Sequence, residues 1–376
     1  MPSARSTVLP LYIGGFMGPF GTLLVLPMFP ELRREFEASS EAVAWGLSAY
    51  MLPMAALLLV SGTIGERIGR SRALTASLGC YAVASLATAA APTLALFLAG
   101  RGLQGACNAF FTPLLLATLA DLTPPGELGA KVGIYSSVQA AGGALGPFLG
   151  GVAADVSWRI AFLGPSLLAL GLIFVLPRQP RVADSSTVAV RPLLTGRMLT
   201  IGLSAFFFAA GPYAGSVLIG LKARDLLGLA ASDTGLILFA GSGAGFVMGP
   251  MWGRLADRIG PARSGAVAAL LSAASLAALS LPDHWLPLVA VWIVVGGTSV
   301  GVITALGNLA ATAVSANRSG ALSLSMAFRF FGHAMGPVIW VPMFSRSTAW
   351  AFGGAGLVGC VAALLFAGLS RSTPKP

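Results

Sequence analysis

The chain has 376 residues, of which only 10% are charged and 56% are hydrophobic, and its mean hydropathy is +0.84. Soluble domains carry about 25% charged residues, so this composition excludes a soluble enzyme, a disordered chain and a disulfide-stapled secreted module. It predicts an all-α integral membrane protein. The net charge of +10 would suit nucleic-acid binding, unless the basic residues follow a membrane topology.

Apolar runs separated by charges or by Pro and Gly breaks predict twelve transmembrane helices of about 20 residues or more. In chain order they cover residues 8–30, 42–62, 73–92, 94–120, 130–154, 158–177, 198–221, 233–254, 262–281, 285–312, 319–343 and 348–369. A polar, basic and proline-containing stretch separates the sixth run from the seventh. We therefore expect an N-terminal six-helix bundle at 1–177, a cytoplasmic linker at 178–197 and a C-terminal six-helix bundle at 198–376.

The basic residues fall mainly at one set of span ends. With both termini in the cytoplasm, 15 Lys and Arg residues lie on that side and six lie outside, namely Arg33, Arg34, Arg159, Lys222, Arg224 and Arg346. This asymmetry predicts a multi-pass protein of the cytoplasmic (inner) membrane with both termini inside. The positive charge then reflects topology and contact with anionic membrane lipid, and we expect no nucleic-acid partner.

Two motifs recur at a spacing close to half the chain length. GTIGERIGRSR at 62–72 matches GRLADRIGPAR at 253–263, and the Gly-x3-Gly-Pro pattern at 142–147 matches the one at 332–337. The spacings are 191 and 190 residues, which indicates a duplicated six-helix unit. Six spans return the chain to the same side, so the two copies are parallel. Parallel repeats with a site at their interface are typical of secondary transporters.

The loop at 62–72 resembles the signature loop of the major facilitator superfamily, and the resemblance covers essentially the whole chain. It implies twelve transmembrane helices in two pseudo-symmetric six-helix bundles. It also implies that this loop locks the two halves on the cytoplasmic side and takes part in a conformational switch. The candidate switch residues are Gly62, Glu66, Arg67, Gly69, Arg70, Arg72, Asp121, Asp257 and Arg258. The alternative is that the arginines only anchor the topology and that Asp121 only ends a helix.

The fifth span is similar to the motif of the exporter, or antiporter, branches of that superfamily. The matching residues are Gly133, Gly142, Gly146, Pro147, Gly150 and Gly151. Small residues let helices approach closely, and proline with glycine makes a hinge. The stretch 39–72 also resembles the second-span region of twelve-span multidrug exporters. Both resemblances imply efflux of drugs or metabolites, and hence a role in multidrug resistance.

Three strongly basic or titratable side chains fall deep inside expected spans, namely Arg101, Arg329 and His333, whereas all 13 acids fall in loops or at span ends. A charge at mid-span costs about 2.5–3.5 kcal/mol on insertion scales, so these residues are functional candidates. With nearby polar side chains, the candidate substrate or coupling residues are Arg101, Gln104, Asn108, Gln139, Arg329 and His333. Lys222 and Arg224 would extend a basic path.

Each of these assignments has an alternative. Arg101 lies in a segment similar to the superfamily's fourth-span motif, which implies that it controls proton transfer or binds an anion; the alternative is a structural hydrogen-bonding centre for backbone carbonyls. His333 is either a proton carrier or a neutral histidine satisfied by a neighbouring group. Because no acid lies inside a span, proton coupling is left open.

Together these features predict a secondary active transporter, not an enzyme, that exports a small amphipathic compound by rocking-bundle alternating access. One alternative is a carrier of organic anions or lipid-like compounds that uses Arg101 and Arg329. An alternative from another class is a non-transporting membrane receptor or scaffold. We expect a monomer whose partners are a small-molecule substrate, membrane lipid and, if coupled, protons. The isolated Cys80, Cys107 and Cys360 offer no metal-ligand spacing, so neither metal nor cofactor is expected.

Overall fold

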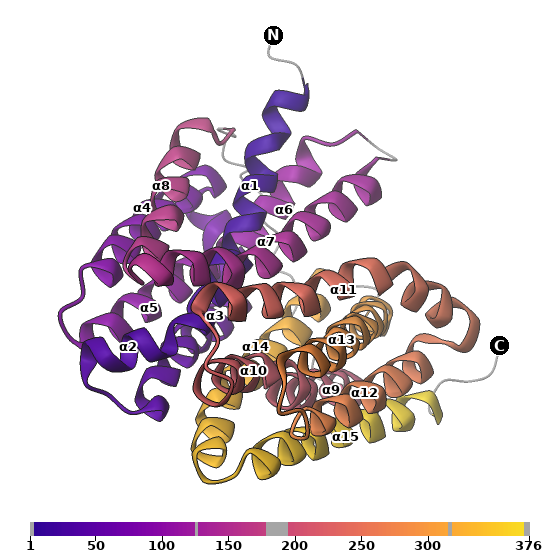
Figure 1. The fold of residues 1–376 in the computed structure, drawn as a ribbon. Helices are drawn as coiled ribbons and strands as arrows, with labels where there is room; N and C mark the ends of the chain where they lie inside the picture. Colours follow the sequence, from indigo (N-terminus) through magenta and orange to yellow (C-terminus); the bar gives the residue numbers. More distant parts are fainter. Residues whose placement is uncertain (1–3, 125–126, 178–194, 315–317, 372–376) are drawn as a thin grey trace. The chain divides into compact units, whose positions relative to one another are not determined.

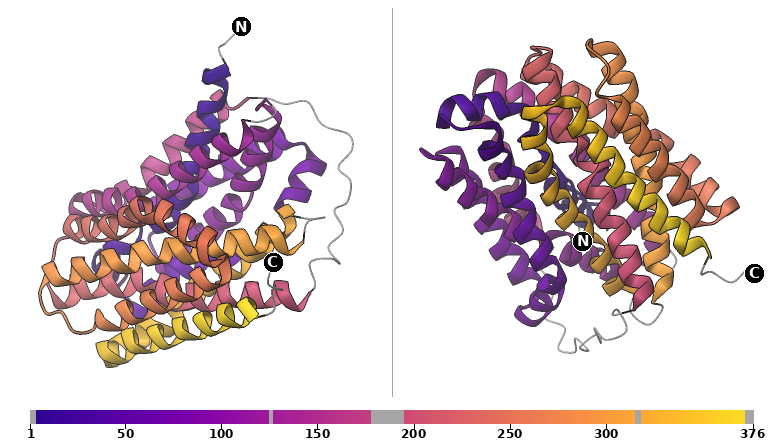
Figure 2. Two further views of the ribbon diagram at one scale, coloured as in Figure 1. Left: turned by 90° about the vertical axis from the view of Figure 1, so that its right-hand side faces the viewer. Right: turned by 90° about the horizontal axis from the view of Figure 1, so that it is seen from below.

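The computed structural model describes residues 4–124, 127–177, 195–314 and 318–371 (Figure 1, Figure 2). These residues form long helices joined by short turns, with no strand among them. The expected all-α class is therefore confirmed. The described part of the predicted linker is limited to its last residues, because 178–194 lie outside the described ranges.

In the first half of the chain, every expected span contains a helix or a broken helix. The elements are α1 (Ala4–Leu23), η1 (Leu26–Met28), α2 (Phe29–Phe36), α3 (Ser40–Ile68), α4 (Arg70–Ala89), α5 (Leu94–Asn108), α6 (Phe111–Asp121), α7 (Leu128–Val156) and α8 (Ile160–Val175). The fourth expected span, predicted as continuous, is divided into α5 and α6.

The second half follows the same plan. Its elements are α9 (Gly196–Ala210), η3 (Pro212–Ala214), α10 (Gly215–Leu221), the π-helical turn η4 (Lys222–Leu226), α11 (Ala231–Ile259), α12 (Pro261–Ala278), α13 (Trp285–Ala313), α14 (Arg318–Arg346) and α15 (Thr348–Arg371). The seventh span, also predicted as continuous, is broken after Gly211, because Pro212 has no N–H and cannot continue the helical hydrogen bonding. The indole Nε1 of Trp340 donates to the Ala210 carbonyl at the end of α9 (2.5 Å).

Seven helical segments in the described ranges are long and apolar enough to cross a membrane by length and composition. They correspond to the first, second, fourth, seventh, eighth, tenth and twelfth expected spans. The other five expected spans are helical as well, as α4, α7, α8, α12 and α14. The number of twelve membrane crossings stays a prediction.

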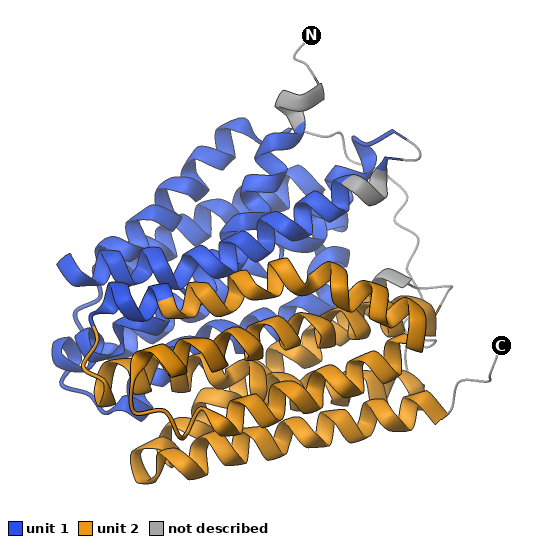
Figure 3. Cartoon of the chain, turned by 45° about the vertical axis from the view of Figure 1, so that its right-hand side comes forward, with its two compact units in different colours: residues 1–187, 230–236 blue, residues 188–229, 237–376 orange. Residues whose placement is uncertain are grey.

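The chain forms two compact units (Figure 3). Unit 1 comprises residues 1–187 and 230–236, and unit 2 comprises residues 188–229 and 237–376. In unit 1, α1 packs against α7 and α3 packs against α5. In unit 2, α9 packs against α14, and α12 packs against α13 and α15.

The sequence repeat is also present in the packing inside each unit. A Cβ at Gly142 of α7 would clash with the Phe16 carbonyl of α1, and a Cβ at Gly332 of α14 would clash with the Phe206 carbonyl of α9. Both members of the second contact lie 190 residues after those of the first. Only glycine allows backbones to approach this closely. The two units are thus built on the same helix crossing, as expected for pseudo-symmetric bundles.

A second crossing repeats in the same way. Gly105 of α5 lies against the Tyr50 carbonyl of α3, and Gly296 of α13 lies against the Gly241 carbonyl of α11. Here both members are related by 191 residues. Each unit therefore contains at least two helix crossings that are fixed by one glycine each.

Candidate functional site

Arg101 is completely buried in α5 and reaches two other helices of unit 1. Its Nε donates to the Gly46 carbonyl of α3 (3.1 Å), Nη1 donates to the Gly21 carbonyl (2.9 Å) and Nη2 donates to the Thr22 carbonyl (3.0 Å). Gly21 and Thr22 belong to the last turn of α1, whose carbonyls have no N–H partner within the helix. A cation at this end is also attracted by the helix dipole. Arg101 therefore caps the C-terminal end of α1.

Gln104 extends this arrangement to α4. It accepts a hydrogen bond from Nη1 of Arg101 (2.9 Å), and its Nε2 donates to Ser85 Oγ (2.8 Å), which in turn donates to the Tyr81 carbonyl (2.8 Å). The guanidinium carbon of Arg101 also lies 4.4 Å from the centre of the Tyr50 ring. Arg101 and Gln104 thus form one network that joins α1, α3, α4 and α5, which is the hydrogen-bonding alternative considered from the sequence.

Asn108 and Gln139 lie in separate contacts. The Asn108 amide Nδ2 faces the Met54 sulfur at 3.1 Å, and Gln139 of α7 donates to Thr112 Oγ1 of α6 at 3.1 Å. Asn108 is buried, whereas Gln139 is half-buried. Within the described ranges, neither side chain is hydrogen-bonded to Arg101.

The signature loop forms an ion-pair network at one end of unit 1. Gly69, with a positive φ of 102°, makes the corner between α3 and α4, a backbone conformation that favours glycine. Arg70 then begins α4 and pairs with Glu66 at 2.7 Å and with Asp121, at the end of α6, at 2.5 Å. Burial alone would lower the pKa of Arg70, but the hydrogen bonds to the two carboxylates outweigh it and raise that pKa. Arg67 and Arg72 are exposed.

The second copy of the loop lacks this network. Gly260 repeats the corner, with φ of 89°, but Pro261 and Thr312 stand 191 residues after Arg70 and Asp121. Asp257 and Arg258 are exposed, and neither takes part in an ion pair within the described ranges. A base and an acid are missing from the second copy, so only the first loop can form this pairing.

The glycines of the fifth span divide by what they contact. Gly142, Gly146 and Gly150 lie against the backbone carbonyls of Phe16, Phe20 and Leu24, in and just after α1. Gly151 lies against the Ala231 carbonyl at the start of α11, and the Pro147 carbonyl lies against Gly235. Gly133 has open space where a Cβ would be. The motif is therefore a packing surface along α7 everywhere except at Gly133.

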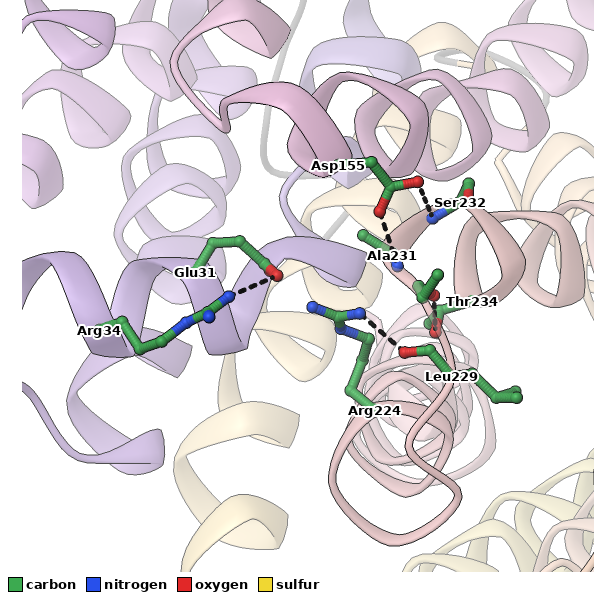
Figure 4. A network of polar contacts seen from close by, with 9 residues as sticks. Glu31, Arg34, Asp155, Arg224, Leu229, Ala231, Ser232 and Thr234 are labelled. Carbon is green, nitrogen blue, oxygen red and sulfur yellow. Dashed lines mark hydrogen bonds and ion pairs between the residues drawn. The ribbon is translucent and has the colours of Figure 1, made fainter.

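Asp155, one of the 13 acids expected in loops or at span ends, caps a helix (Figure 4). Its carboxylate accepts hydrogen bonds from the backbone N–H of Ala231 (3.1 Å) and Ser232 (3.3 Å), the first residues of α11. A carboxylate at this position satisfies free N–H groups and interacts favourably with the helix dipole. The sequence signal was an acid four residues after Gly151, the last glycine of the α7 motif.

Lys222 and Arg224 do not form a free basic path, because both donate to backbone carbonyls. Lys222 is buried, and its Nζ donates to the carbonyls of Leu279 (2.9 Å) and Ser280 (3.0 Å), just after α12. Arg224 donates to the Leu229 carbonyl at 2.7 Å (Figure 4). Two of the buried cations described so far, Arg101 and Lys222, thus cap helix ends.

Arg329 and His333 lie on α14 at positions four residues apart and differ from Arg101 in their surroundings. His333 is 1% exposed, and neither of its ring nitrogens has a hydrogen-bond partner among the described residues. Its ring packs edge-on against that of Tyr213 in η3, with 4.8 Å between the ring centres. The guanidinium of the half-buried Arg329 lies 5.2 Å from the centre of the Phe330 ring and within electrostatic range of Tyr213. The structure brings these residues together in unit 2.

Comparison with known proteins gives one consistent family. The sequence profile of the Major Facilitator Superfamily matches residues 11–221 and 201–376. The tetracenomycin C resistance and export protein of Streptomyces glaucescens is 30% identical over 202 residues, which are 52% of this chain and 38% of that protein. The chain therefore spans well under half the length of that relative.

Two further proteins are similar over nearly the whole chain. The multidrug efflux protein YfmO of Bacillus subtilis (strain 168) is 26% identical over 347 residues, which are 89% of this chain and 86% of that protein. The crystal structure of a bacterial homologue of the human lysosomal transporter Spinster, inward-facing and unoccupied, has a TM-score of 0.80 at 16% identity and covers 99% of this chain and 98% of its own. This last similarity establishes the fold alone.

Proposed function

The chain belongs to the Major Facilitator Superfamily, and on that premise we propose that it is a secondary transporter that exports small amphipathic compounds across the cytoplasmic membrane. The observation that carries the proposal is the similarity to a multidrug efflux protein over 89% of the chain. The relative from Streptomyces glaucescens is likewise named for resistance and export. The close packing of α7 on α1 through Gly142, Gly146 and Gly150 fits the exporter branch that the sequence resembles.

Alternating access is the mechanism that this architecture supports. Each unit has its own helix crossings and its own core, so each can move as a body while its internal contacts stay intact. In transporters built from parallel repeats, the substrate site lies near the middle of the membrane at the repeat interface. We propose that the Arg70 network, which lies within unit 1, is the exception, and that its ion pairs form and break as the transporter changes conformation.

Transport by the purified protein tests the proposal. In proteoliposomes, the purified protein is expected to raise the flux of amphipathic test compounds above the flux in protein-free vesicles. Cationic, neutral and anionic compounds are compared. An imposed pH gradient is then applied in both directions. A flux that responds to the gradient supports proton antiport, and an unchanged flux contradicts it. Equal fluxes with and without protein for all three classes contradict export.

The ion-pair network provides a second prediction. Asp121→Asn is expected to change the free energy of unfolding by less than about 1 kcal/mol, because partly exposed ion pairs contribute little. The transport rate is expected to fall severalfold, since Arg70 loses one of its two partners. The matched control is Asp257→Asn in the second loop, where no ion pair is present among the described residues. Equal transport rates for the two variants would show that the network has no part in the cycle.

A further inference from the structure

His333 is a buried polar side chain whose hydrogen-bonding capacity is unused. A neutral imidazole has one N–H donor and one acceptor nitrogen, and neither has a partner among the described residues of the structure. Buried polar groups are normally hydrogen-bonded, because an unpaired one loses its bonds to water without replacement. Burying an ionisable residue within a membrane span is also costly, so such a residue is a functional candidate.

Arg329 lies one helical turn before His333, and the two side chains interact electrostatically. In the described ranges its guanidinium takes part in no hydrogen bond or ion pair, and it lies over the Phe330 ring. Arg101 is different, since it donates four hydrogen bonds to neighbouring groups. Of the two arginines deep in expected spans, Arg329 is therefore the one whose planar donor fork is available to a ligand.

The backbone beside these residues is irregular. Tyr213, which packs on His333, lies in the turn η3 between α9 and α10. Within a membrane, non-helical backbone is tolerated where it is buried in protein or lines a cavity, and broken helices mark the binding sites of many transporters. Because Tyr213 is on a turn, its ring can move away from the imidazole without unwinding a long helix.

From these observations we infer that Arg329, His333 and Tyr213 form a recognition site for an oxyanion with a neighbouring hydroxyl group, carried on an apolar body. The inference rests on the proposed transport function and names its substrate class. Arg329 binds the oxyanion through paired N–H donors. One ring nitrogen of His333 accepts a hydrogen bond from the hydroxyl. The rings of Tyr213 and Phe330 contact the apolar body.

An oxyanion of this kind has two sources, an exported compound or an anionic phospholipid headgroup. Both would bind through Arg329, and a competition experiment distinguishes them. A phospholipid that occupies the site competes with a soluble ligand, whereas lipid that only surrounds the protein does not.

Binding to the purified chain in nanodiscs of phosphatidylcholine tests the site directly. The probes are 1-hydroxy-2-naphthoate, its methyl ester, which lacks the charge, and 2-naphthoate, which lacks the hydroxyl. We expect Arg329→Gln to weaken binding of the hydroxy acid about tenfold or more, in line with hydrogen bonds to charged groups, and to leave binding of the ester unchanged. His333→Phe is expected to abolish the preference for the hydroxy acid over 2-naphthoate.

Two further variants control for folding and for charge. Arg346→Gln makes the same change at an exposed position on α14 and is expected to bind all three probes as the wild type does. Arg329→Lys keeps the positive charge but lacks the paired N–H donors of the guanidinium, so we expect a loss of affinity for the hydroxy acid between those of the wild type and Arg329→Gln. Thermal unfolding of every variant confirms that it is folded. If Arg329→Gln proves unstable, the comparison of Arg329→Lys with Arg346→Gln provides the test.

The outcomes separate the site from the function. If the wild type binds the hydroxy acid no better than the ester, or if Arg329→Gln and Arg346→Gln bind it alike, the recognition site is overturned even where flux in proteoliposomes supports export. Specific binding without flux of any test compound supports the site and contradicts export. Loss of probe binding when phosphatidylglycerol is added, in the wild type and in Arg346→Gln alike, identifies the headgroup as the occupant of the same site.

Discussion

Alanine at Gly105 is expected to prevent most of the protein from accumulating in folded form. A Cβ at this position would clash with the carbonyl oxygen, carbonyl carbon and Cα of Tyr50, which are backbone atoms that no side-chain rotation can move. Helices α3 and α5 would have to separate, and the hydrogen bond from Arg101 to Gly46 across the same crossing would lengthen. Overpacking in a core costs about 1–3 kcal/mol, and a backbone clash places this variant at or above the upper end.

Thermal unfolding in detergent, followed by size-exclusion chromatography, measures this effect. The repeat predicts a similar loss for Gly296→Ala, since Gly296 lies against the Gly241 carbonyl in unit 2. Gly102→Ala and Gly307→Ala are the matched controls on the same two helices. The nearest atom to a Cβ at Gly102 is 3.5 Å away, and no atom lies within 4 Å at Gly307. Unfolding temperatures that do not differ between the test and control variants would contradict the packing argument.

The helices and their duplication could be predicted from the sequence because both depend on local or repeated patterns. Hydropathy locates long apolar helices, and the spacing of the Gly-x3-Gly-Pro motif links Gly142 to Gly332 before any contact is seen. The breaks in the fourth and seventh spans could not be predicted in this way, because apolar residues continue on both sides of them. The break after Gly211 has a sequence signal in Pro212, which hydropathy does not detect, but nothing in the sequence marks Trp340, 130 positions away, as the donor to Ala210.

The roles of the site residues depended on partners that a sequence does not identify. Arg101 donates to carbonyls of Gly21 and Gly46, and every residue has a carbonyl, so no pattern marks these two. Asp155 accepts from backbone N–H groups of α11, which are equally unmarked. The loss of the ion-pair network from the second loop, in contrast, could have been predicted from Pro261 and Thr312, which stand where Arg70 and Asp121 would be repeated.

Arg101→Gln is expected to destabilise the protein by about 3–5 kcal/mol, as is typical when one partner is removed from a buried charged network. The shorter amide cannot reach α1 and α3 together, so the carbonyls of Gly21, Thr22 and Gly46 lose a donor. Arg101→Lys keeps the charge but has a single nitrogen, which cannot span two helices as the guanidinium does. We therefore expect it to restore only part of the stability.

Arg329→Gln is the matched control, because it makes the same change at the other arginine that lies deep in an expected span. The guanidinium of Arg329 has no hydrogen bond within the described ranges, so its removal leaves no carbonyl unpaired. The unfolding temperature of Arg329→Gln is expected to stay within a few degrees of that of the wild type. The unfolding temperature of Arg101→Gln is expected to fall, and less of that variant is expected to be folded. The reverse result would assign the structural role to Arg329 and free Arg101 for the substrate. Since a helix cap must act in every conformation whereas a ligand contact acts only when the ligand is bound, stability without substrate distinguishes the two roles.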